Sequence, residues 1–463
     1  MNFRFGAIVL AAALLLTGCG PATPSVKAGE SCNKESKAIV KFDGGAFECR
    51  LFAGNKRKYV QVSNTPVATK QTLNTVETSQ CKLPDKISTP GKWTGGSVGY
   101  PAVGEFNSVG TVNVAVVPID FSDVAEAKDA EWLQEQVDTM DDWITRFSNG
   151  KMKLNWQAQY KWVRAPKPAA MYNWAHPIIQ ADGSSKVYAE NQQDEGAMRQ
   201  QLFEAATKYY DFSKTDYVFF VFPKVIGNTI AHGPDARNYT VKTSKGTFTL
   251  GFSFTSGELY RMGYQWHQWI HEFLHSAGLK GHAPGNEMPY QIMGWDNQAG
   301  QGLDAWDTFI LGWFDDNQVA CYDLNKIKNE SIILTSTERD LPGVKAAMVR
   351  LSNHELVVVE SRRKDKYSLG YPDGFYGIQA YYIDTNNPGK RYDGATDLAT
   401  EMKYFAYYLR VDAANHGYGE PKLDIFDTKL DVVGYVGDTF TYKNLHIKVT
   451  NTGDFDTIEL TKN

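Results

Sequence analysis

Hydrophobic positions in the middle of the chain follow two different periods, and their order predicts alternating strands and helices. Residues 111–121 form a continuous apolar run rich in Val, as is typical of a strand buried on both faces. A helix is predicted at residues 125–147, where apolar side chains recur at helical spacing: Leu133, Val137, Met140, Ile144 and Phe147. Residues 153–163 alternate as a strand, residues 202–210 predict a second helix, and residues 216–223 predict another buried strand. This order indicates a layer of α/β structure.

The two ends of the chain have patterns that differ from the middle. Residues 26–85 hold short β-like runs, such as residues 59–62, and predict a small β module. Residues 86–108 are rich in Gly, Pro and Ser and predict a linker. Towards the carboxyl terminus, runs such as residues 355–360 and 446–450 are separated by Gly, Asp and Asn turns, which predicts a β-rich region.

The amino terminus has the features of a secretion signal. A single positive charge, Arg4, precedes the apolar run of residues 6–16, which is shorter than the roughly 20 residues needed to span a bilayer. The sequence LTGC that ends at Cys19 resembles the lipobox of bacterial lipoproteins, in which the Cys is lipidated and becomes the first residue of the mature chain. The next residue, Gly20, is not the Asp that retains lipoproteins in the inner membrane. The resemblance therefore implies an outer-membrane or cell-surface location, and the alternative is an ordinary signal peptide with a chance Cys.

Composition and charge narrow the classes of protein that fit the chain. It has 463 residues, of which 42% are apolar and 22% are charged, as in ordinary folded proteins. Its net charge of −5 provides no basic excess to neutralise a phosphate backbone, so we expect no nucleic-acid partner. No segment after the signal is long and apolar enough to span a membrane. Only five Cys occur, which excludes a disulfide-dense scaffold.

The cysteines predict at most two disulfide bridges. If Cys19 carries lipid, the four others allow three connectivities in an oxidising envelope. Cys32 and Cys49 flank a β-like run and an Asp-Gly-Gly turn, so this pair is predicted to staple a small hairpin at its base. Cys81 and Cys321 are left as the second pair, for which the sequence offers no independent argument.

A cluster of histidines carries the candidate chemistry. His271, Glu272 and His275 form the motif His-Glu-x-x-His, which matches that of zinc peptidases. Residues four apart on a helix have Cβ atoms about 5–6 Å apart on one face, so both imidazoles can reach one zinc ion at about 2.0–2.1 Å. Glu272 lies about 100° round the helix. From there its carboxylate can take a proton from a zinc-bound water without being a ligand.

Other interpretations of these histidines are weaker. One alternative is a surface helix whose histidines are simply polar side chains. The apolar side of this segment, and Gly278 where a helix C-cap belongs, favour a buried, well-defined helix instead. His267 lies four residues before His271 and shares its face, which would make a rival pair of ligands. In that register Gln268 takes the place of the base, and an amide cannot act as one. We therefore expect His267 beside the site or on the surface.

Several segments resemble the immune inhibitor A family of bacterial secreted zinc metallopeptidases. Residues 114–123 resemble the family's opening strand, and residues 144–154 resemble its helix-to-strand step. Residues 291–295 (QIMGW) resemble the Met-Gly turn that floors the metal site, with Met293 as its Met. Further similar segments are residues 212–223, 304–313, 360–362 and 378–384. The resemblance covers about residues 110–385, and weakly the last 30. It implies a metzincin-like fold, a catalytic zinc ion and hydrolysis of peptide bonds in proteins.

The third metal ligand departs from the family's pattern. In the family it usually stands ten residues after the first His, which here is Gly281, whereas His282 stands eleven residues after. The resemblance implies His282 as the third ligand if the loop absorbs one extra residue. Glu287 and Asp296 are the alternatives.

These observations predict an α+β chain in four parts. Residues 1–18 are a lipoprotein signal peptide, and residues 19–108 are a small β module with a linker. Residues 109–325 form a metzincin-like zinc metallopeptidase domain, with a mixed sheet and an active-site helix. Residues 326–463 form a β-rich C-terminal domain.

The predicted function is a membrane-tethered, extracytoplasmic zinc endopeptidase that cleaves proteins or peptides, acts as a monomer and binds no nucleic acid. The alternative is a surface lipoprotein that binds proteins or glycans and carries a relict, inactive peptidase domain. Retention of Glu272 with both helix histidines speaks against this alternative. Asp-rich loops such as residues 384–397 offer oxygen ligands for structural calcium, although no loop matches a known calcium-binding spacing.

Overall fold

The computed structural model forms two compact units, which divide between Asn64 and Thr65. The residues that it describes are 40–42, 45–52, 56–62, 71–86, 96–172, 178–179, 185–186, 195–225, 234–255, 259–260, 263, 265–280, 284, 290–294, 300, 302–368, 371, 376–387, 405–412, 432–451 and 455–463. Predictions that lie outside these residues, and stay predictions, concern Cys19, Cys32, His282, Glu287, Asp296 and most of the loop 384–397. Among the described helices, none is long and apolar enough to cross a membrane.

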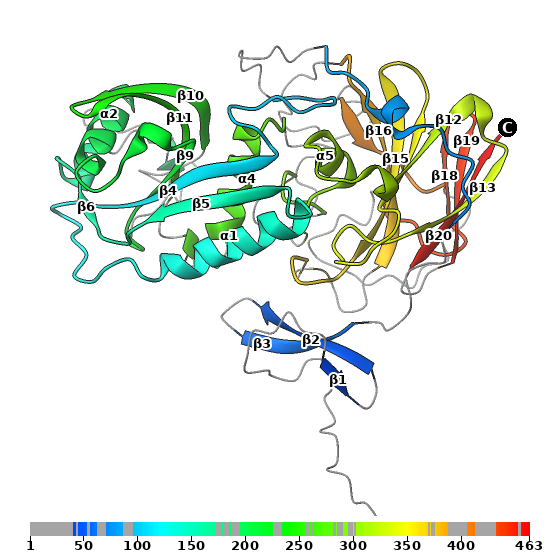
Figure 1. Ribbon diagram of the computed structural model, residues 1–463, viewed down its shortest axis with the longest axis horizontal. Helices are drawn as coiled ribbons and strands as arrows, with labels where there is room; N and C mark the ends of the chain where they lie inside the picture. The colour runs from blue at the N-terminus through cyan, green and yellow to red at the C-terminus, as the bar shows by residue number, and fades with distance from the viewer. Residues whose placement is uncertain are drawn as a thin grey trace, which may run out of the picture. The chain divides into compact units, whose positions relative to one another are not determined.

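The smaller unit contains a three-stranded antiparallel sheet, drawn in blue in Figure 1. Its strands are β1 (Val40–Phe42), β2 (Gly45–Phe52) and β3 (Lys56–Val62). The antiparallel pairing of β1 with β2, which includes Phe42 opposite Gly45, confirms the predicted hairpin. Cys49 lies in β2, but its predicted partner Cys32 is outside the described residues.

The larger unit contains a mixed six-stranded sheet (Figure 1). Its order is β10-β11-β9-β4-β5, and β6 pairs with the end of β4. All pairs are parallel except β10 with β11, which is antiparallel. The strands are β4 (Gly110–Asp120), β5 (Met152–Ala158), β6 (Val163–Arg164), β9 (Tyr217–Val221), β10 (Pro234–Thr243) and β11 (Gly246–Thr255). The central positions of β4 and β9 confirm the two apolar runs predicted as buried strands.

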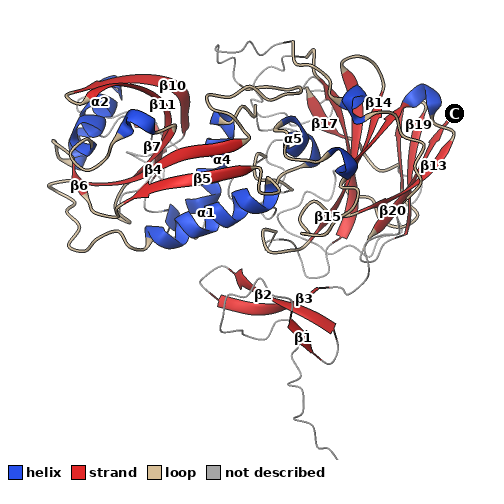
Figure 2. Cartoon of the chain, viewed as in Figure 1, coloured by secondary structure: helices blue, strands red, loops and turns tan. Residues whose placement is uncertain are grey.

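Helices cover both faces of this sheet (Figure 2). Helices α1 (Leu133–Phe147) and α4 (Gln265–Ser276) share one hydrophobic core with alternate residues of β4, such as Val114 and Val116. Helix α2 (Glu195–Ala206) packs with the opposite set, such as Ala115. Because successive side chains in a strand point to opposite faces, one apolar run supplies both cores.

Three predicted boundaries of these elements are wrong. Helix α1 begins at Leu133, because residues 125–132 form bends and turns before it. Helix α2 runs Glu195–Ala206, so it begins earlier and ends earlier than the predicted 202–210. The strand predicted at residues 153–163 is interrupted after Ala158, in a loop where Tyr160 has a positive φ of 56°.

The carboxyl-terminal region consists of two packed β-sheets. The five-stranded sheet has the order β12-β14-β15-β16-β17, and the four-stranded sheet has the order β13-β20-β19-β18. Side chains from both sheets form one core, which confirms the β-rich pattern of the sequence. The strands are β12 (Val319–Asp323), β13 (Asn329–Leu334), β14 (Ala346–Arg350), β15 (Glu355–Arg363), β16 (Tyr376–Asp384), β17 (Ala406–Tyr408), β18 (Thr439–Tyr442), β19 (Leu445–Asn451) and β20 (Asp456–Lys462).

Shorter elements complete the described part of the chain. Helix α5 (Ala305–Ile310) packs against β15, and the short strands β7 and β8 pair with each other. The bounds of the remaining short elements are β7 (Ile178–Ile179), β8 (Ser185–Lys186), η1 (Thr78–Cys81), η2 (Ala169–Tyr172), η4 (Phe212–Lys214), η5 (Asp316–Gln318) and η6 (Leu324–Lys326). With its mixed sheets and few helices, the chain is α+β.

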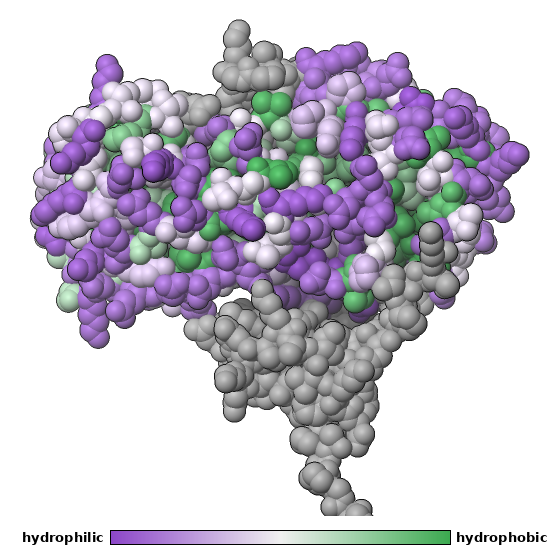
Figure 3. Space-filling view, in the orientation of Figure 1, coloured by the Kyte–Doolittle hydropathy of each residue, from purple (hydrophilic) through white to green (hydrophobic). Residues whose placement is uncertain are grey.

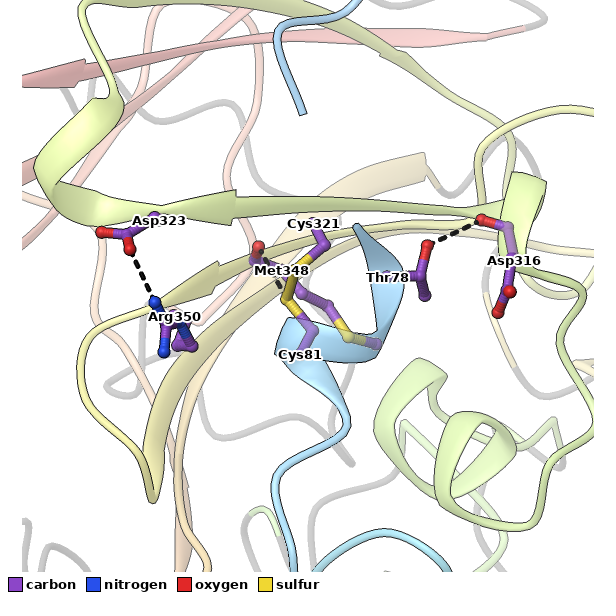
Figure 4. The surroundings of a disulfide bond; sticks show 7 residues. All are labelled: Thr78, Cys81, Asp316, Cys321, Asp323, Met348 and Arg350. Carbon is purple, nitrogen blue, oxygen red and sulfur yellow. Dashed lines mark hydrogen bonds and ion pairs between the residues drawn. A yellow bond between two sulfur atoms is a disulfide. The ribbon is translucent and has the colours of Figure 1, made fainter. Parts of the chain in front are cut away.

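The described residues before β4 pack into the larger unit. A disulfide joins Cys81 at the end of η1 to Cys321 on β12, as the remaining pair of cysteines predicted (Figure 4). Beside it, the hydroxyl of Thr78 donates a hydrogen bond to the carbonyl oxygen of Asp316 at 3.2 Å. The predicted linker is wrong over residues 96–108, where Ser97 and Val98, for example, are buried.

The surface of the larger unit is mostly hydrophilic on the face drawn in Figure 3, with smaller hydrophobic areas between. The predicted domain boundaries after residues 108 and 325 both fall inside this unit. One hydrophobic core also runs from the mixed sheet to the inner side of the five-stranded sheet, where it includes Val358 and Tyr381. The helix that carries the histidine motif, α4, is part of that continuous core.

Candidate metal centre

Helix α4 is held against the sheet by aromatic side chains. Trp269 stacks on Phe219 of β9 with ring centroids 4.6 Å apart, and its indole Nε1 donates to Thr255 Oγ1 at 3.1 Å. Phe273 packs edge-on against Tyr217 of the same strand, with centroids 5.5 Å apart. Because Trp269 and Phe273 are one helical turn apart, their contacts fix both the position of the helix along its axis and its rotation about that axis. The histidines therefore have a defined direction.

Gly278 caps the carboxyl end of helix α4, as the sequence predicted. This residue has φ of 114°, a conformation that favours glycine, and its N–H donates to the carbonyl of His275 at 3.0 Å. The N–H of Leu279 donates to the carbonyl of Leu274 at 3.0 Å. These two bonds are those of a Schellman motif, which turns the chain sharply after the helix.

The two motif histidines converge as predicted. The Nε2 atoms of His271 and His275 lie 3.2 Å apart, and the ligand atoms of His271, Glu272 and His275 all lie within 4.8 Å of one another. His271 and Glu272 are each 5% exposed, whereas His275 is half-buried, so the group has one side nearer to water. In the described part of the chain it is the one group of His, Cys, Asp and Glu with the geometry of a metal site.

Carbonyl oxygens fix the tautomers of both imidazoles. Nδ1 of His271 lies 2.8 Å from the carbonyl oxygen of Ile292, and Nδ1 of His275 lies 3.0 Å from that of Leu279. A carbonyl oxygen can only accept, so both Nδ1 atoms carry the hydrogen. In the neutral rings both Nε2 lone pairs then point at the same space. This arrangement is repulsive by itself and becomes favourable when a cation lies between the two nitrogens.

Glu272 also interacts electrostatically with a tyrosine of strand β9. Burial raises the pKa of Tyr217 well above its usual value, and the charges of Glu272 and Glu105 add to this effect. Glu272 is thus close to the metal-binding nitrogens and also within electrostatic range of Tyr217.

The segment predicted to be a Met-turn contacts α4 through its backbone. Ile292 supplies the carbonyl that orients His271, and its own N–H donates to the carbonyl of Gly302 at 2.9 Å. Met293 is fully buried in the same core as α4. Its predicted role beneath the imidazoles stays a prediction.

The remaining sequence predictions have different outcomes. Of the two places expected for His267, the surface is excluded because the residue is only 7% exposed. A place beside the site stays a prediction, and His267 is not part of the metal-capable group among the described residues. The third ligand predicted at His282, with Glu287 and Asp296 as alternatives, lies outside the described residues. The roles of Ile292 and Leu279 have no signal in the sequence, because every residue has a backbone carbonyl.

Comparison with known proteins adds little. No protein-family model matches the chain, and no curated protein matches it. The C-terminal lobe of a budding yeast Argonaute is a weak structural neighbour with 11% identity and a TM-score of 0.21, covering 81% of this chain and 55% of that one. Kluyveromyces polysporus Argonaute with a guide RNA gives 11% identity and a TM-score of 0.18, covering 74% of this chain and 30% of that one. The chain thus spans about half of the first structure's length, and likenesses this low support no argument.

Proposed function

We propose that this protein is a zinc metalloendopeptidase of the immune inhibitor A type, tethered to the bacterial cell envelope by lipid on Cys19. One observation carries the proposal. His271 and His275 present their Nε2 atoms to each other at 3.2 Å, while carbonyl oxygens hold both Nδ1 atoms. This is the arrangement that two imidazoles need in order to share one metal ion, because a ligating His usually donates its other ring N–H to a fixed acceptor.

Zinc fits these residues by distance. A tetrahedral zinc ion with nitrogen ligands at about 2.0–2.1 Å holds them about 3.3 Å apart. The separation of 3.2 Å between the two Nε2 atoms agrees with that value. When bound, zinc polarises a carbonyl group and lowers the pKa of a coordinated water to about 7.

The residues of the chain would then transfer the protons and shield the site from water. The carboxylate of Glu272 accepts the proton of the attacking water and passes it to the leaving amine. Its position one residue after His271 keeps it near the reacting atoms without using it as a ligand. The low exposure of Glu272 and His271 excludes bulk water, which strengthens each charge interaction in the site.

The architecture supports a metzincin-like fold and a polypeptide substrate. Helix α4 follows the mixed sheet directly in the chain, and the turn that contains Met293 then returns to it through Ile292. Strand β10 lies at the end of the sheet order and also contacts α4. An edge strand can bind an extended peptide through its backbone groups, which suits protein cleavage.

Digestion of casein by the purified full chain tests the proposal. We expect cleavage that stops in the presence of a zinc chelator and returns when zinc is added back. Stoichiometric zinc without any cleavage would instead favour the alternative, a surface lipoprotein with an inactive peptidase domain. Failure of the protein to bind zinc or any other divalent metal would contradict the peptidase.

The third ligand is proposed to be His282, because a catalytic zinc normally has three protein ligands and water. We expect His282→Ala to lose zinc and activity, while Glu287→Ala retains most of both. Metal content of the two purified variants, measured by mass spectrometry, decides between them. Full zinc content in His282→Ala with loss in Glu287→Ala would transfer the role to the carboxylate.

The lipid tether is proposed from the LTGC sequence alone. We expect the mature protein to partition into detergent with lipid on Cys19, and Cys19→Ser to be released or unprocessed. A correctly cleaved wild-type protein that stays in the aqueous phase would contradict the tether without affecting the metal site.

A further inference from the structure

The carboxyl end of helix α4 is completed by a distant segment, residues 96–105, which we call the strap. The last carbonyl groups of a helix have no partner within it. Here the carbonyl of Ser276 accepts a hydrogen bond from the N–H of Glu105, and the carbonyl of Gly278 accepts one from the N–H of Ser97, both at 2.7 Å. The strap therefore satisfies backbone groups that the turn after α4 leaves open.

The strap also holds the residue that orients His275. Ser97 forms a parallel β-bridge with Leu279, and Leu279 supplies the carbonyl oxygen 3.0 Å from Nδ1 of that histidine. Leu279 is fully buried. A displacement of the strap would thus move an atom that bonds directly to a metal-binding imidazole. His271 has no such dependence, because its acceptor is the carbonyl of Ile292.

Glycines allow the two backbones to touch. A Cβ on Gly104 would lie 2.4 Å from the carbonyl carbon of Ala277, and one on Gly96 would lie 2.5 Å from Cα of Lys280. A Cβ on Gly278 would lie 2.8 Å from the backbone nitrogen of Gly104. These neighbours are main-chain atoms, so no side chain can move aside to make room.

The far side of the strap is fixed to other parts of the larger unit. The N–H of Val98 donates to Asp85 Oδ2 at 2.6 Å, and the N–H of Ala102 donates to the carbonyl of Ile310 in α5 at 2.8 Å. Within the strap, the N–H of Val103 donates to Ser97 Oγ at 2.8 Å. The strap is therefore anchored on one side and bonded to the exit of α4 on the other.

We infer that the strap is a positioning element of the metal centre, which sets the Leu279 carbonyl and through it the direction of Nε2 in His275. The inference rests on the proposed function and assigns a role to residues outside the metal-capable group of His271, Glu272 and His275. It predicts that crowding the strap weakens metal binding more than it weakens the fold.

Gly104→Ala is the direct test, with Gly434→Ala as its matched control. In both positions a Cβ meets close atoms, since one on Gly434 would lie 2.6 Å from Cε2 of Phe440 in the β-rich region. Zinc affinity is measured by competition with a chromophoric chelator, alongside the Tm of the metal-free protein and the visible spectrum with cobalt in place of zinc. We expect Gly104→Ala to bind zinc about 10- to 100-fold more weakly, as when other groups that orient metal ligands are removed. Its cobalt spectrum should change, while Gly434→Ala lowers Tm and keeps the wild-type affinity.

Other outcomes overturn the inference or the proposed function separately. Wild-type zinc affinity in Gly104→Ala, or equal loss of affinity in both variants, overturns the positioning role and leaves the peptidase proposal intact. Absence of zinc binding by the wild-type protein overturns the peptidase proposal itself.

If Gly104→Ala does not fold, Ser97→Ala serves instead, because it removes only the hydroxyl that accepts from Val103. Its zinc affinity should fall roughly 2- to 10-fold, the effect of one lost hydrogen bond, and an unchanged affinity overturns the role.

Discussion

Helices α1 and α4 lie on the same face of the mixed sheet, but they bury different kinds of side chain. Helix α1 buries one apolar stripe, with Gln136 as its only buried polar residue. Helix α4 buries most of its circumference, including six polar residues: Gln265, His267, Gln268, His271, Glu272 and Ser276. Burial of a polar group without a hydrogen bond costs about 1–3 kcal/mol in proteins. The buried polar residues are therefore concentrated in the helix that carries the proposed metal centre, whereas α1 buries almost only apolar side chains.

The largest expected effect is a fall in kcat on substitution of the proposed base in helix α4. Glu272→Gln keeps the size of the side chain and both imidazoles but removes the base. We expect zinc content to stay at the wild-type level while kcat falls roughly 10²- to 10⁴-fold, which is the usual contribution of general base catalysis. Steady-state cleavage of a fluorogenic peptide, together with metal analysis, measures both quantities. Wild-type turnover by this variant would show that the site in α4 is not catalytic.

A core substitution in α1 should have the opposite profile. Met140 is fully buried, so Met140→Ala should reduce the free energy of unfolding by about 2–5 kcal/mol. Zinc affinity of the folded fraction should not change, because Met140 supplies no group to the centre. Chemical denaturation and metal competition separate the two effects. Loss of zinc affinity in the folded protein would mean that α1 also serves the site.

Helix α5 sharpens the comparison, because it buries carboxylates rather than imidazoles. Burial raises the pKa of its N-cap residue Asp304 to about 6, and burial also raises the pKa of nearby Glu360 to about 8. A carboxyl group whose pKa is raised by folding stabilises the folded state most at low pH. That stability is lost as the pH rises from the unfolded pKa through the folded pKa. For Asp304 this window is from about 4 to about 6.

Asp304→Asn removes this charge but keeps the oxygen that accepts from the N–H of Asp307. Relative to wild type, the variant should therefore gain up to about 2–3 kcal/mol of stability between pH 4 and pH 6. Denaturation curves at several pH values measure the difference. A constant difference across this range would show that Asp304 does not titrate with the fold.

The smallest effect is expected on the exposed side of α1. Gln134 donates from Nε2 to Asp138 Oδ1 at 2.8 Å, across one turn of the helix in water. Gln134→Ala should change the free energy of unfolding by only about 0.2–0.5 kcal/mol, as is typical of such pairs. A change above 1 kcal/mol in denaturation would show that the polar side of α1 also has a structural partner.

The same contrast explains what the sequence could predict. The stripe of α1 and the buried run of β4 are regular patterns, so both elements were predicted, and only the start of α1 was wrong. The histidine pair was predicted because its spacing is local, four residues on one helix. Ile292 and Leu279 act through carbonyl oxygens, which every residue possesses, so their roles depend on the folded chain.

The error over residues 96–108 has a different physical cause. Glycine indicates freedom in an isolated chain, and the run before β4 was therefore predicted to be a linker. In the folded protein, Gly96 and Gly104 are needed because they have no side chain to separate two backbones. Sequence alone cannot distinguish these uses, since the neighbouring backbone lies far along the chain.

The disulfide between Cys81 and Cys321 has a consequence for biosynthesis. It closes a covalent ring over a sequence separation of 240 residues, and this ring contains every strand of the mixed sheet as well as helix α4. Cys81 is synthesised before Cys321, so this disulfide cannot form until Cys321 has been added to the chain. Ring closure therefore takes place only after the whole segment that contains the mixed sheet and helix α4 has been synthesised. A product truncated before residue 321 keeps a thiol that alkylating reagents can detect, and so remains chemically distinguishable from the finished protein.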